Sequence, residues 1–323
     1  GEKEYTFDEM IDYKEGDRGF KVKAEDTYGY ITISTLPVTY KTIPGPSLTL
    51  TESTILAGTD AKKGVPVQIE SVRGVHEVVI YRIENGSEVE ALRETKNGEH
   101  TLNYAPEIDF TEATSKLKVV VSDGREGKEA IGYMKAYVNM DVATLNVGSQ
   151  PLANNAHVKY PDAFGMVSLN DLKTYSVDYA IANEVNAKNV DFKFYCFGAS
   201  GSPRLYSMDN TGKDGEFSGS TGKLSAIKVK NLTRFAILSN FDYENATVAS
   251  ISSEILSSSI AQSLLDPIAV GNVIAFRTGG SSAAGGGRIG VMKVINITEP
   301  KELVSNNATA RVMTVEIKFP KKK

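Results

Sequence analysis

YTFDEMIDYKEGDRGFKVKAED, residues 5–26, matches LNYAPEIDFTEATSKLKVVVSD, residues 102–123, without a gap and at a constant offset of 97 residues. The identical pairs are Ile11 with Ile108, Asp12 with Asp109, Glu15 with Glu112, Lys21 with Lys118, Val22 with Val119 and Asp26 with Asp123. The aromatic or apolar character is kept where Phe20 aligns with Leu117. Because a repeat reveals the architecture before any local assignment, this one predicts two copies of one domain.

The spacing of the repeat indicates immunoglobulin-like sandwiches. The offset of 97 residues is close to the ~100 residues of that fold. Each copy also ends in a strand, a polar turn with Gly29 or Gly127, and a second strand. Residues 47–140 are therefore expected to form a whole immunoglobulin-like sandwich. Residues 1–43 are expected to be the C-terminal part of another, whose opening strands would precede residue 1.

The whole copy and its boundary can be followed in the sequence. Its expected early strands are residues 47–51, 65–71 and 76–84, and Asn85-Gly86 has the composition of a two-residue hairpin turn. Before it, Pro44-Gly45-Pro46 belongs to a short segment in which two prolines remove amide donors and stiffen the chain. This segment is the predicted linker.

Residues 141–323 have a sequence pattern that differs from that of the repeat, and they are predicted to form a larger β-sandwich or jelly-roll-like domain. Runs rich in β-branched and aromatic residues predict strands. These are residues 175–181, 190–197, 225–229, 235–238, 273–277, 288–297 and 310–319. Residues 244–265 are expected to form one helix, because apolar residues recur there at roughly helical spacing before Asp266-Pro267. The fold class is therefore mainly β, with tandem sandwiches followed by a β-rich domain.

Composition excludes several classes of protein. The 323 residues carry a net charge of −4, too balanced for the basic footprint of a nucleic-acid-binding protein. No run approaches the ~18 apolar residues of a membrane span. One cysteine and three histidines offer no disulfide framework and no Cys/His metal cluster. We expect no metal and no cofactor.

The C-terminal domain resembles a known group of proteins in five strand-like segments. These are NVDFKFY at 189–195, NLTRF at 231–235, GNVIAFRT at 271–278, RIGVMKV at 288–294 and VMTVEIK at 312–318. They resemble the C-terminal domain of uncharacterised surface lipoproteins of gut Bacteroidetes, in which immunoglobulin-like repeats follow a lipid-anchoring cysteine. The resemblance implies export to the extracellular or outer-membrane surface of a Gram-negative bacterium. It also implies adhesion or glycan handling, with membrane attachment only through a lipid anchor outside this sequence.

Three segments suggest chemistry but have simpler interpretations. The glycine-rich residues 279–287 lack the following helix and the Lys-Ser/Thr pair of a phosphate-binding loop, which favours a hairpin connection. Residues 209–216 are rich in oxygen ligands, but Lys213 falls at a calcium-ligand position, so turn formation is favoured. Cys196 lies in an apolar strand and is expected to be a small buried hydrophobe rather than a nucleophile.

The candidate ligand-binding residues come from loop-like stretches of the C-terminal domain. Aromatic faces and hydrogen-bonding groups are what sugar recognition needs, although the chain has no tryptophan. Residues 204–217 are expected to be a long segment with neither strand nor helix periodicity, placed where binding loops concentrate. The candidates are Tyr160, Phe164, Arg204, Tyr206, Asp209, Asn210 and Phe217. The competing interpretation is that the aromatic residues anchor loops to the core.

The sequence favours a non-catalytic cell-surface binding or adhesion protein. Its partner would be a glycan or another surface macromolecule, with the sandwiches as spacer and no catalytic residues. Two alternatives remain open. Glycosidase carboxylates are placed by the fold rather than by sequence spacing, so an exported hydrolase with dispersed carboxylates in the C-terminal domain is one. The other is a purely structural stalk.

Overall fold

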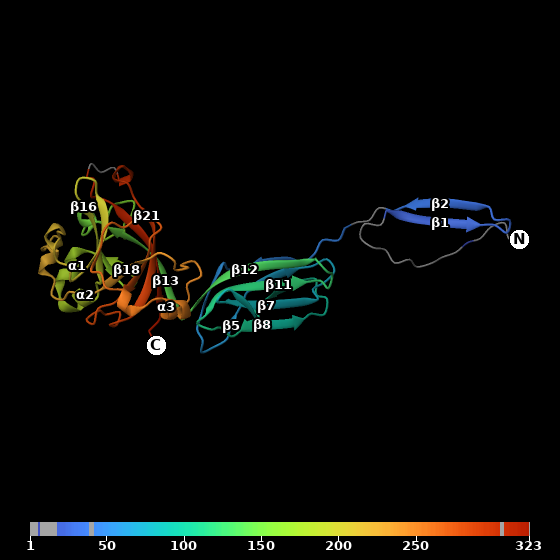
Figure 1. Cartoon of the computed structure of the whole chain (residues 1–323), viewed down its shortest axis with the longest axis horizontal. Helices are drawn as coiled ribbons and strands as arrows, with labels where there is room; N and C mark the ends of the chain where they lie inside the picture. The colour runs from blue at the N-terminus through green and yellow to red at the C-terminus, as the bar shows by residue number, and fades with distance from the viewer. Residues whose placement is uncertain (1–5, 7–17, 39–41, 304–306, 323) are drawn as a thin grey trace.

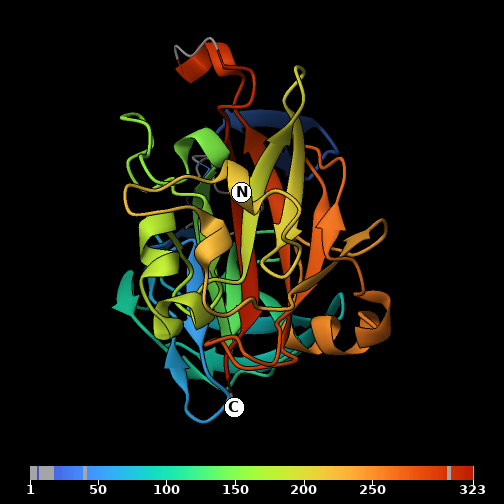
Figure 2. The same ribbon diagram turned by 90° about the vertical axis from the view of Figure 1, so that its left-hand side faces the viewer.

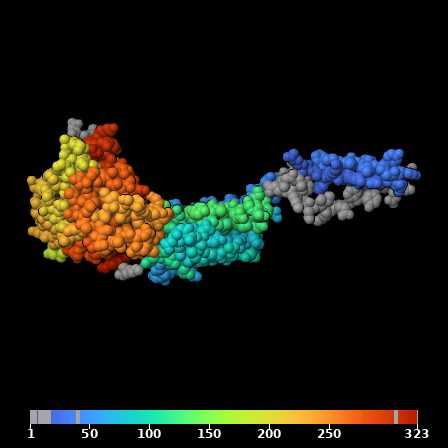
Figure 3. All heavy atoms as spheres, in the orientation of Figure 1, coloured from blue at the N-terminus to red at the C-terminus, as the bar shows by residue number. Residues whose placement is uncertain are grey.

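The computed structural model describes residues 6, 18–38, 42–303 and 307–322, and its fold is mainly β. An N-terminal hairpin, a middle sandwich and a larger C-terminal domain follow one another along the long axis (Figures 1 and 3). The predicted fold class is confirmed. The repeat positions Ile11, Asp12 and Glu15 lie outside the described residues, so the two copies are compared over residues 18–38.

The N-terminal hairpin consists of β1 (Gly19–Glu25) and β2 (Ile31–Pro37), paired antiparallel. Almost every residue in it is exposed, including Leu36 at 61%. Gly29 takes a positive φ of 84° in the turn. A two-stranded hairpin without a packed face is marginally stable in water, so this element depends on whatever covers it.

The middle sandwich has two principal sheets. The larger has the order β4-β12-β11-β7-β8, formed by β4 (Thr54–Ala57), β12 (Glu129–Val138), β11 (Thr114–Ser122), β7 (Glu77–Glu84) and β8 (Ser87–Thr95). The smaller has the order β3-β6-β9, formed by β3 (Ser47–Leu50), β6 (Val67–Glu70) and β9 (Thr101–Tyr104). A short pair, β5 (Lys63–Gly64) and β10 (Glu107–Ile108), completes the part.

Alternation along the strands builds the core of this sandwich. In β6 the side chains of Val67 and Ile69 are buried while their neighbours are exposed, and β11 buries every second residue from Leu117 onward. Strands with a period of two place these residues on one face of each sheet, and the two faces meet in one hydrophobic cluster. Asn85 and Gly86 have φ of 50° and 81°, which confirms the predicted hairpin turn.

The C-terminal domain packs two five-stranded sheets against each other. One has the order β13-β22-β21-β20-β18, formed by β13 (Met140–Gly148), β22 (Val312–Pro320), β21 (Ile289–Ile297), β20 (Val273–Arg277) and β18 (Arg234–Leu238). The other has the order β15-β14-β16-β17-β19, formed by β15 (Lys173–Tyr175), β14 (Met166–Ser168), β16 (Phe192–Phe197), β17 (Ser202–Ser207) and β19 (Leu264–Leu265). The main core lies between them. The glycine-rich residues 279–287 join β20 to β21, which is the expected hairpin connection.

A third layer covers part of the outer face of the β14–β19 sheet. It contains α1 (Val177–Ala182), α2 (Glu184–Lys188) and the short 3-10 helices η2 (Asp214–Glu216) and η3 (Leu224–Ala226). Their apolar residues form a second cluster with side chains of β16 and β17. Figure 2 views the domain from this side.

Two predicted strands are wrong in this layer. Residues 175–181 were expected to be a strand, but only Tyr175 ends β15, and α1 follows because Ser176 caps it by accepting a hydrogen bond from the Tyr179 N–H. Residues 225–229 contain the end of η3 instead of a strand. Ile227 is nevertheless packed in the second cluster, so the apolar pattern there reports burial rather than strand pairing.

The single helix predicted at 244–265 is also wrong. The described residues contain three short α-helices, and α3 (Val248–Glu254) is only the middle of the predicted one. Thr247 and Ser250 form a capping box at its start. Beyond Ile255 the serine-rich sequence has weak helix propensity, and the chain forms η4 (Ser257–Ser259), a bridge at Gln262 and then β19.

The remaining elements are 3-10 turns, η1 (Gln150–Leu152) and η5 (Pro300–Leu303). Where the middle sandwich meets the C-terminal domain, β12 and β13 are separated by Asn139 alone. Tyr137 and Met140 pack there in a cluster with α3 and the sheet. Glu244 bridges the two parts through Lys135 at 3.1 Å and Lys293 at 2.9 Å.

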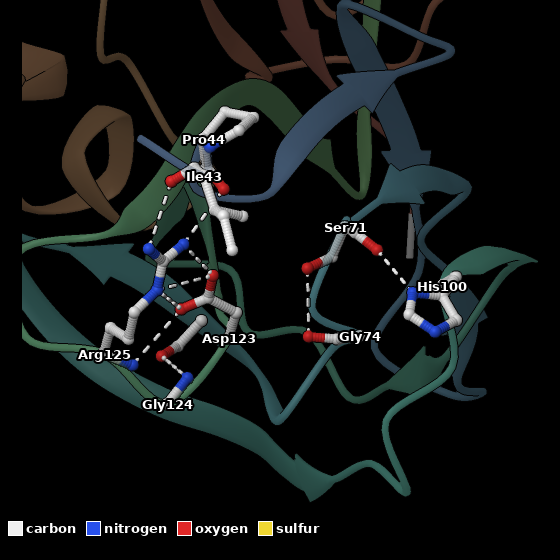
Figure 4. Close-up of polar contacts among 9 residues, drawn as sticks. Ile43, Pro44, Ser71, Gly74, His100, Asp123, Gly124 and Arg125 are labelled. Atoms are coloured by element: carbon white, nitrogen blue, oxygen red, sulfur yellow. Dashed lines mark hydrogen bonds and ion pairs between the residues drawn. The ribbon is translucent and has the colours of Figure 1, made fainter. Parts of the chain in front are cut away.

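The opposite end of the middle sandwich holds the linker. Arg125 donates to the carbonyl oxygens of Ile43 (3.1 Å) and Pro44 (2.9 Å) and pairs with Asp123 at 2.6 Å (Figure 4). Beside it, His100 Nδ1 lies 2.9 Å from the carbonyl oxygen of Ser71. The linker is thus bound to the sandwich that follows it.

Candidate ligand-binding surface

The structure brings together five of the seven candidate residues, those between 204 and 217, and leaves the other two elsewhere. Tyr160 is partly buried and packs against the edge of a separate small hydrophobic cluster that contains Leu303. Phe164 is half-buried and lines a shallow hollow with Asp162 and Lys173. Neither residue shares a surface with the stretch from Arg204 to Phe217.

Tyr206 and Phe217 are core residues. Tyr206 lies on β17 and is 4% exposed, and Phe217 is fully buried. Both contact the ring of Tyr195, at centroid distances of 5.5 and 6.1 Å. The expectation that 204–217 lacks strand or helix structure is wrong, because β17 extends to Ser207 and η2 begins at Asp214. Two aromatic members of the predicted set therefore have the geometry of anchors.

Asp209 and Asn210 belong to a charged network that holds the covering layer. Asp209 forms a two-point ion pair with Arg234, with both distances 2.8 Å. The ammonium of Lys193, fully buried, donates to Asp214 Oδ1 at 2.6 Å and to the carbonyl oxygen of Asn210 at 3.0 Å. Burial lowers the pKa of Lys193, and the Asp214 carboxylate opposes that shift. Buried charges need such partners, so the network fixes the path of residues 207–217.

The oxygen-rich residues 209–216 have cationic partners in the structure. Each carboxylate of the segment already faces a cation: Asp209 faces Arg234, Asp214 faces Lys193, and Glu216 faces Lys213. Across the residues that the structure describes, no group of three or more His, Cys, Asp or Glu side chains is placed to hold a metal ion. The turn interpretation accounts for this segment.

An exposed patch lies where β16 ends and β17 begins, next to these anchors. Phe197 is 40% exposed, and the guanidinium of Arg204 stacks over its ring at 4.0 Å from the centroid. The ammonium of Lys213 lies 5.1 Å from the same centroid and 2.8 Å from Glu216 Oε1. Arg204 also pairs with Asp266 at 2.8 Å. We call Phe197, Arg204, Lys213, Glu216 and Asp266 the hairpin patch.

Electrostatics keep the patch charged at neutral pH. Bonds from Lys213 and from the Tyr195 hydroxyl lower the pKa of Glu216. Burial, and then the bond to Glu216, raises the pKa of Tyr195 to about 12, so its hydroxyl remains a donor. The patch therefore offers one apolar ring surrounded by two cations and two carboxylates. Such a surface can contact a polar ligand through both C–H faces and hydrogen bonds.

Cys196, the neighbour of Phe197, points the opposite way. Its side chain is buried between the two sheets, and burial raises the pKa of the thiol to about 12. The expected interpretation as a small buried hydrophobe is confirmed.

Sequence reasoning missed Phe197, Lys213, Glu216 and Asp266. The signal was present in strand alternation, since Phe192, Phe194 and Cys196 enter the main core and the residues between them face the other way. Phe197 is the last residue of β16, beyond the part of the sheet that the covering layer hides. An aromatic residue at the end of the outward-facing series is therefore the one left exposed.

Comparisons with known proteins add little to this geometry. No family model matches the chain, and no curated protein matches it. Among solved structures, the N-terminal eight Ig domains of Down Syndrome Cell Adhesion Molecule (isoform 1.30.30) are 8% identical with a TM-score of 0.21, over 88% of this chain and 36% of that one. Escherichia coli alpha-2-macroglobulin activated by porcine elastase is 8% identical with a TM-score of 0.23, over 94% of this chain and 24% of that one.

This chain thus spans well under two thirds of either of those two chains. Similarities at such low scores carry no argument about function. No helix within the described ranges has the length and apolar character needed to cross a membrane.

Proposed function

We propose that this chain is a non-catalytic binding or adhesion protein of the bacterial cell surface, and that its C-terminal domain binds a glycan or another surface macromolecule through the hairpin patch. The immunoglobulin-like part acts as a spacer. The location proposed is the extracellular or outer-membrane surface of a Gram-negative bacterium, following the resemblance of the C-terminal segments to surface lipoproteins of gut Bacteroidetes. Attachment would be through a lipid anchor outside this sequence.

The observation that carries the proposal is the exposed ring of Phe197 among paired charges. A ring that is 40% exposed, stacked by Arg204 and flanked by Lys213, is a fixed apolar contact in a polar setting. Sugars present C–H faces edged by hydroxyl groups, which match an aromatic ring edged by carboxylates and ammonium groups. The ion pairs with Glu216 and Asp266 hold the cations in place before a ligand arrives.

The position of the patch agrees with a presenting role. In Figure 1 the strand β16 rises at the side of the C-terminal domain opposite the junction with the middle sandwich. The buried network around Lys193 supports residues 207–217 from below, so the patch rests on a rigid base. Binding residues are commonly carried in this way on a rigid β scaffold.

The test is a screen of the full chain against an array of bacterial and host glycans. Phe197→Ala is expected to weaken binding to any glycan identified by about two- to tenfold, because an aromatic contact contributes about 0.5–1.5 kcal/mol. Tyr133→Ala is the matched control, since Tyr133 is a 59% exposed aromatic residue on β12 of the middle sandwich. Equal binding by both variants, or an array without hits, would count against the hairpin patch.

The non-catalytic part of the proposal has its own test. Any glycan identified on the array is incubated with the purified chain, and the products are followed by mass spectrometry. We expect the glycan to remain intact. Cleavage that disappears on replacing one Asp or Glu of the C-terminal domain would establish the hydrolase instead.

A further inference from the structure

The edge strand β18 offers unpaired backbone groups beside a groove. It is the last strand of the β13-β22-β21-β20-β18 sheet, so one side of it has no neighbouring strand of that sheet. Phe235 forms an outward hydrogen-bonded pair with Gln262, at 2.8 Å and 3.1 Å. Because outward-facing groups alternate along an antiparallel strand, the next outward residue is Ile237.

Nothing in the described part of the chain occupies that next position. No described backbone or side-chain group bonds the N–H or C=O of Ile237, and its side chain is 45% exposed. The segment that pairs with Phe235 leaves the edge at once, because η4 and the buried Ile260 carry the chain toward α3. The edge is thus covered at one residue and open at the next.

The open part of the edge borders a groove of about 600 Å³. Its floor and walls include Ile237, Leu238 and Phe241 on one side and Ile255 on the other. Glu254 is the charged residue of the lining. The same carboxylate also lines an adjoining hollow with Asp242 and Asn245, which follow β18, so it lies toward the C-terminal end of that strand. Among the described residues no ion pair neutralises Glu254.

We infer that this groove binds an extended, basic-and-apolar peptide segment of a partner protein, which adds to β18 as an antiparallel strand. An edge strand with free N–H and C=O groups is a template for such pairing, in which the main chain supplies affinity and alternate side chains supply specificity. The antiparallel direction continues the pairing that the chain already makes at Gln262.

The register predicts the peptide sequence. Its residue opposite Ile237 exchanges both backbone hydrogen bonds with Ile237 and places its side chain on the Ile237 face. The residue before it points to the α3 face, lies opposite Leu238 and meets Glu254. The pairing ends at the residue opposite Ile237, because Gln262 of the chain already pairs with Phe235. The pattern is therefore a basic residue followed by an apolar residue that is the last of the paired segment.

This site is separate from the hairpin patch and does not rest on the proposed function. A probe that fits the register is the blocked pentapeptide acetyl-threonine-valine-threonine-lysine-isoleucine-amide, whose last residue lies opposite Ile237. We expect the full chain to bind it in a fluorescence or calorimetric titration. The control peptide carries an N-methyl group on its isoleucine, which removes the donor to the Ile237 carbonyl, and it is expected to bind at least tenfold more weakly.

Variants of the chain test the same register. Ile237→Pro removes the outward N–H without breaking the ladder to β20, since that N–H faces away from the sheet, and should weaken peptide binding at least tenfold. Ile237→Val keeps the N–H and should bind like the unmodified chain. Glu254→Lys should weaken binding of the lysine peptide and favour a glutamate peptide of otherwise equal sequence. Phe197→Ala should leave peptide binding unchanged.

The result that overturns the inference is equal binding of the two peptides or of the Ile237 variants. If Ile237→Pro fails to fold, hydrogen–deuterium exchange of the unmodified chain decides, because the peptide must slow exchange in residues 236–240. An absence of such protection also overturns it. Concentration-dependent dimerisation that blocks the peptide and is lost with Ile237→Lys would assign the edge to a second copy of the chain instead.

Discussion

The β1–β2 and β11–β12 hairpins have related sequences and the same cross-strand pairing, yet they have opposite environments. Phe20 faces Leu36 in the first as Leu117 faces Met134 in the second. Leu117 and Met134 are buried in the core of the middle sandwich, whereas Leu36 is 61% exposed. The comparison separates what a hairpin sequence determines from what its neighbours determine.

The strands of a hairpin pair within a short stretch of sequence, whereas the burial of their side chains depends on strands from elsewhere in the chain. β11 is covered on one edge by β7, β12 is paired on its outer edge with β4, and the β3-β6-β9 sheet packs on their apolar face. The first hairpin has no such neighbours among the described residues. The turns also differ, since five residues (26–30) join β1 to β2 and six (123–128) join β11 to β12. The offset between the copies therefore grows from 97 to 98 residues after the turn.

The largest difference is expected when the equivalent apolar residues are truncated. Leu117→Ala should destabilise the middle sandwich by about 2–5 kcal/mol, because it removes buried methyl groups and leaves a cavity. Phe20→Ala should change the same unfolding transition by less than about 0.5 kcal/mol, since Phe20 lies outside that core. Urea denaturation followed by hydrogen exchange of the β7 and β11 amides measures both. Equal effects would contradict the separation of the two environments.

A second contrast lies at the two aspartates that the repeat aligns. Asp26 accepts hydrogen bonds from the backbone N–H groups of Tyr28 and Tyr30, whereas Asp123 is buried against Arg125. Arg125→Ala should cost about 1–3 kcal/mol, because it leaves a buried carboxylate without its main partner and frees the linker carbonyls. Arg125→Lys should recover only part of this, since one ammonium cannot reproduce the fork. Thermal unfolding measures the loss.

The glycines of the two turns give a smaller and matched effect. Gly29 and Gly127 have φ of 84° and 68°, and a Cβ atom at either position would meet no other atom. Replacement by alanine should therefore cost only the backbone strain, about 1 kcal/mol. In the middle sandwich this should shift the unfolding midpoint, whereas in the first hairpin it should appear only as faster amide exchange of β1 and β2. A midpoint shift from Gly29→Ala would indicate that the hairpin unfolds together with the sandwich.

The smallest expected effect is a pH dependence at Asp123. The side-chain bonds from Arg125 hold the pKa of Asp123 below its ordinary value of 3.8. The stabilisation is thus present above pH 3.8 and is lost as the pH falls through the lower, folded-state pKa. The difference in unfolding free energy between the unmodified chain and Asp123→Asn should be constant from pH 7 to 5 and shrink below pH 4. A difference that does not change with pH would exclude the charge as its cause.

The sequence predicted what depends on local alternation. The strand at residues 273–277 is present with those bounds, and the Asn85-Gly86 turn was recognisable because few residue pairs accept positive φ at both positions. The helix at 244–265 was not predictable from spacing alone, because Ile260 is buried by an extended segment rather than by a helical face. Apolar spacing reports burial, and different backbones can produce the same spacing.

The candidate surface was predicted only in part for a similar reason. Arg204 was among the predicted residues. Tyr206 lies two residues further along β17, on the same face of the strand, but it is buried because the covering layer packs over Tyr206 and not over Arg204. Phe197 looked like a core residue in an apolar strand. Whether a residue is covered depends on where residues 208–230 pass over the sheet, and the buried pair of Lys193 and Asp214 sets that path.

The parallel pairing of β4 with β12 has a mechanical consequence. These strands lie near the entry and exit of the middle sandwich, and their register runs from Thr54 opposite Lys135 to Ala57 opposite Val138. Tension applied between the linker and the C-terminal domain pulls the two strands along their length in opposite directions. All the hydrogen bonds between them are then strained together in shear, instead of opening one after another as in a peeled hairpin. Breaking this pair by such tension therefore requires several hydrogen bonds to rupture at once.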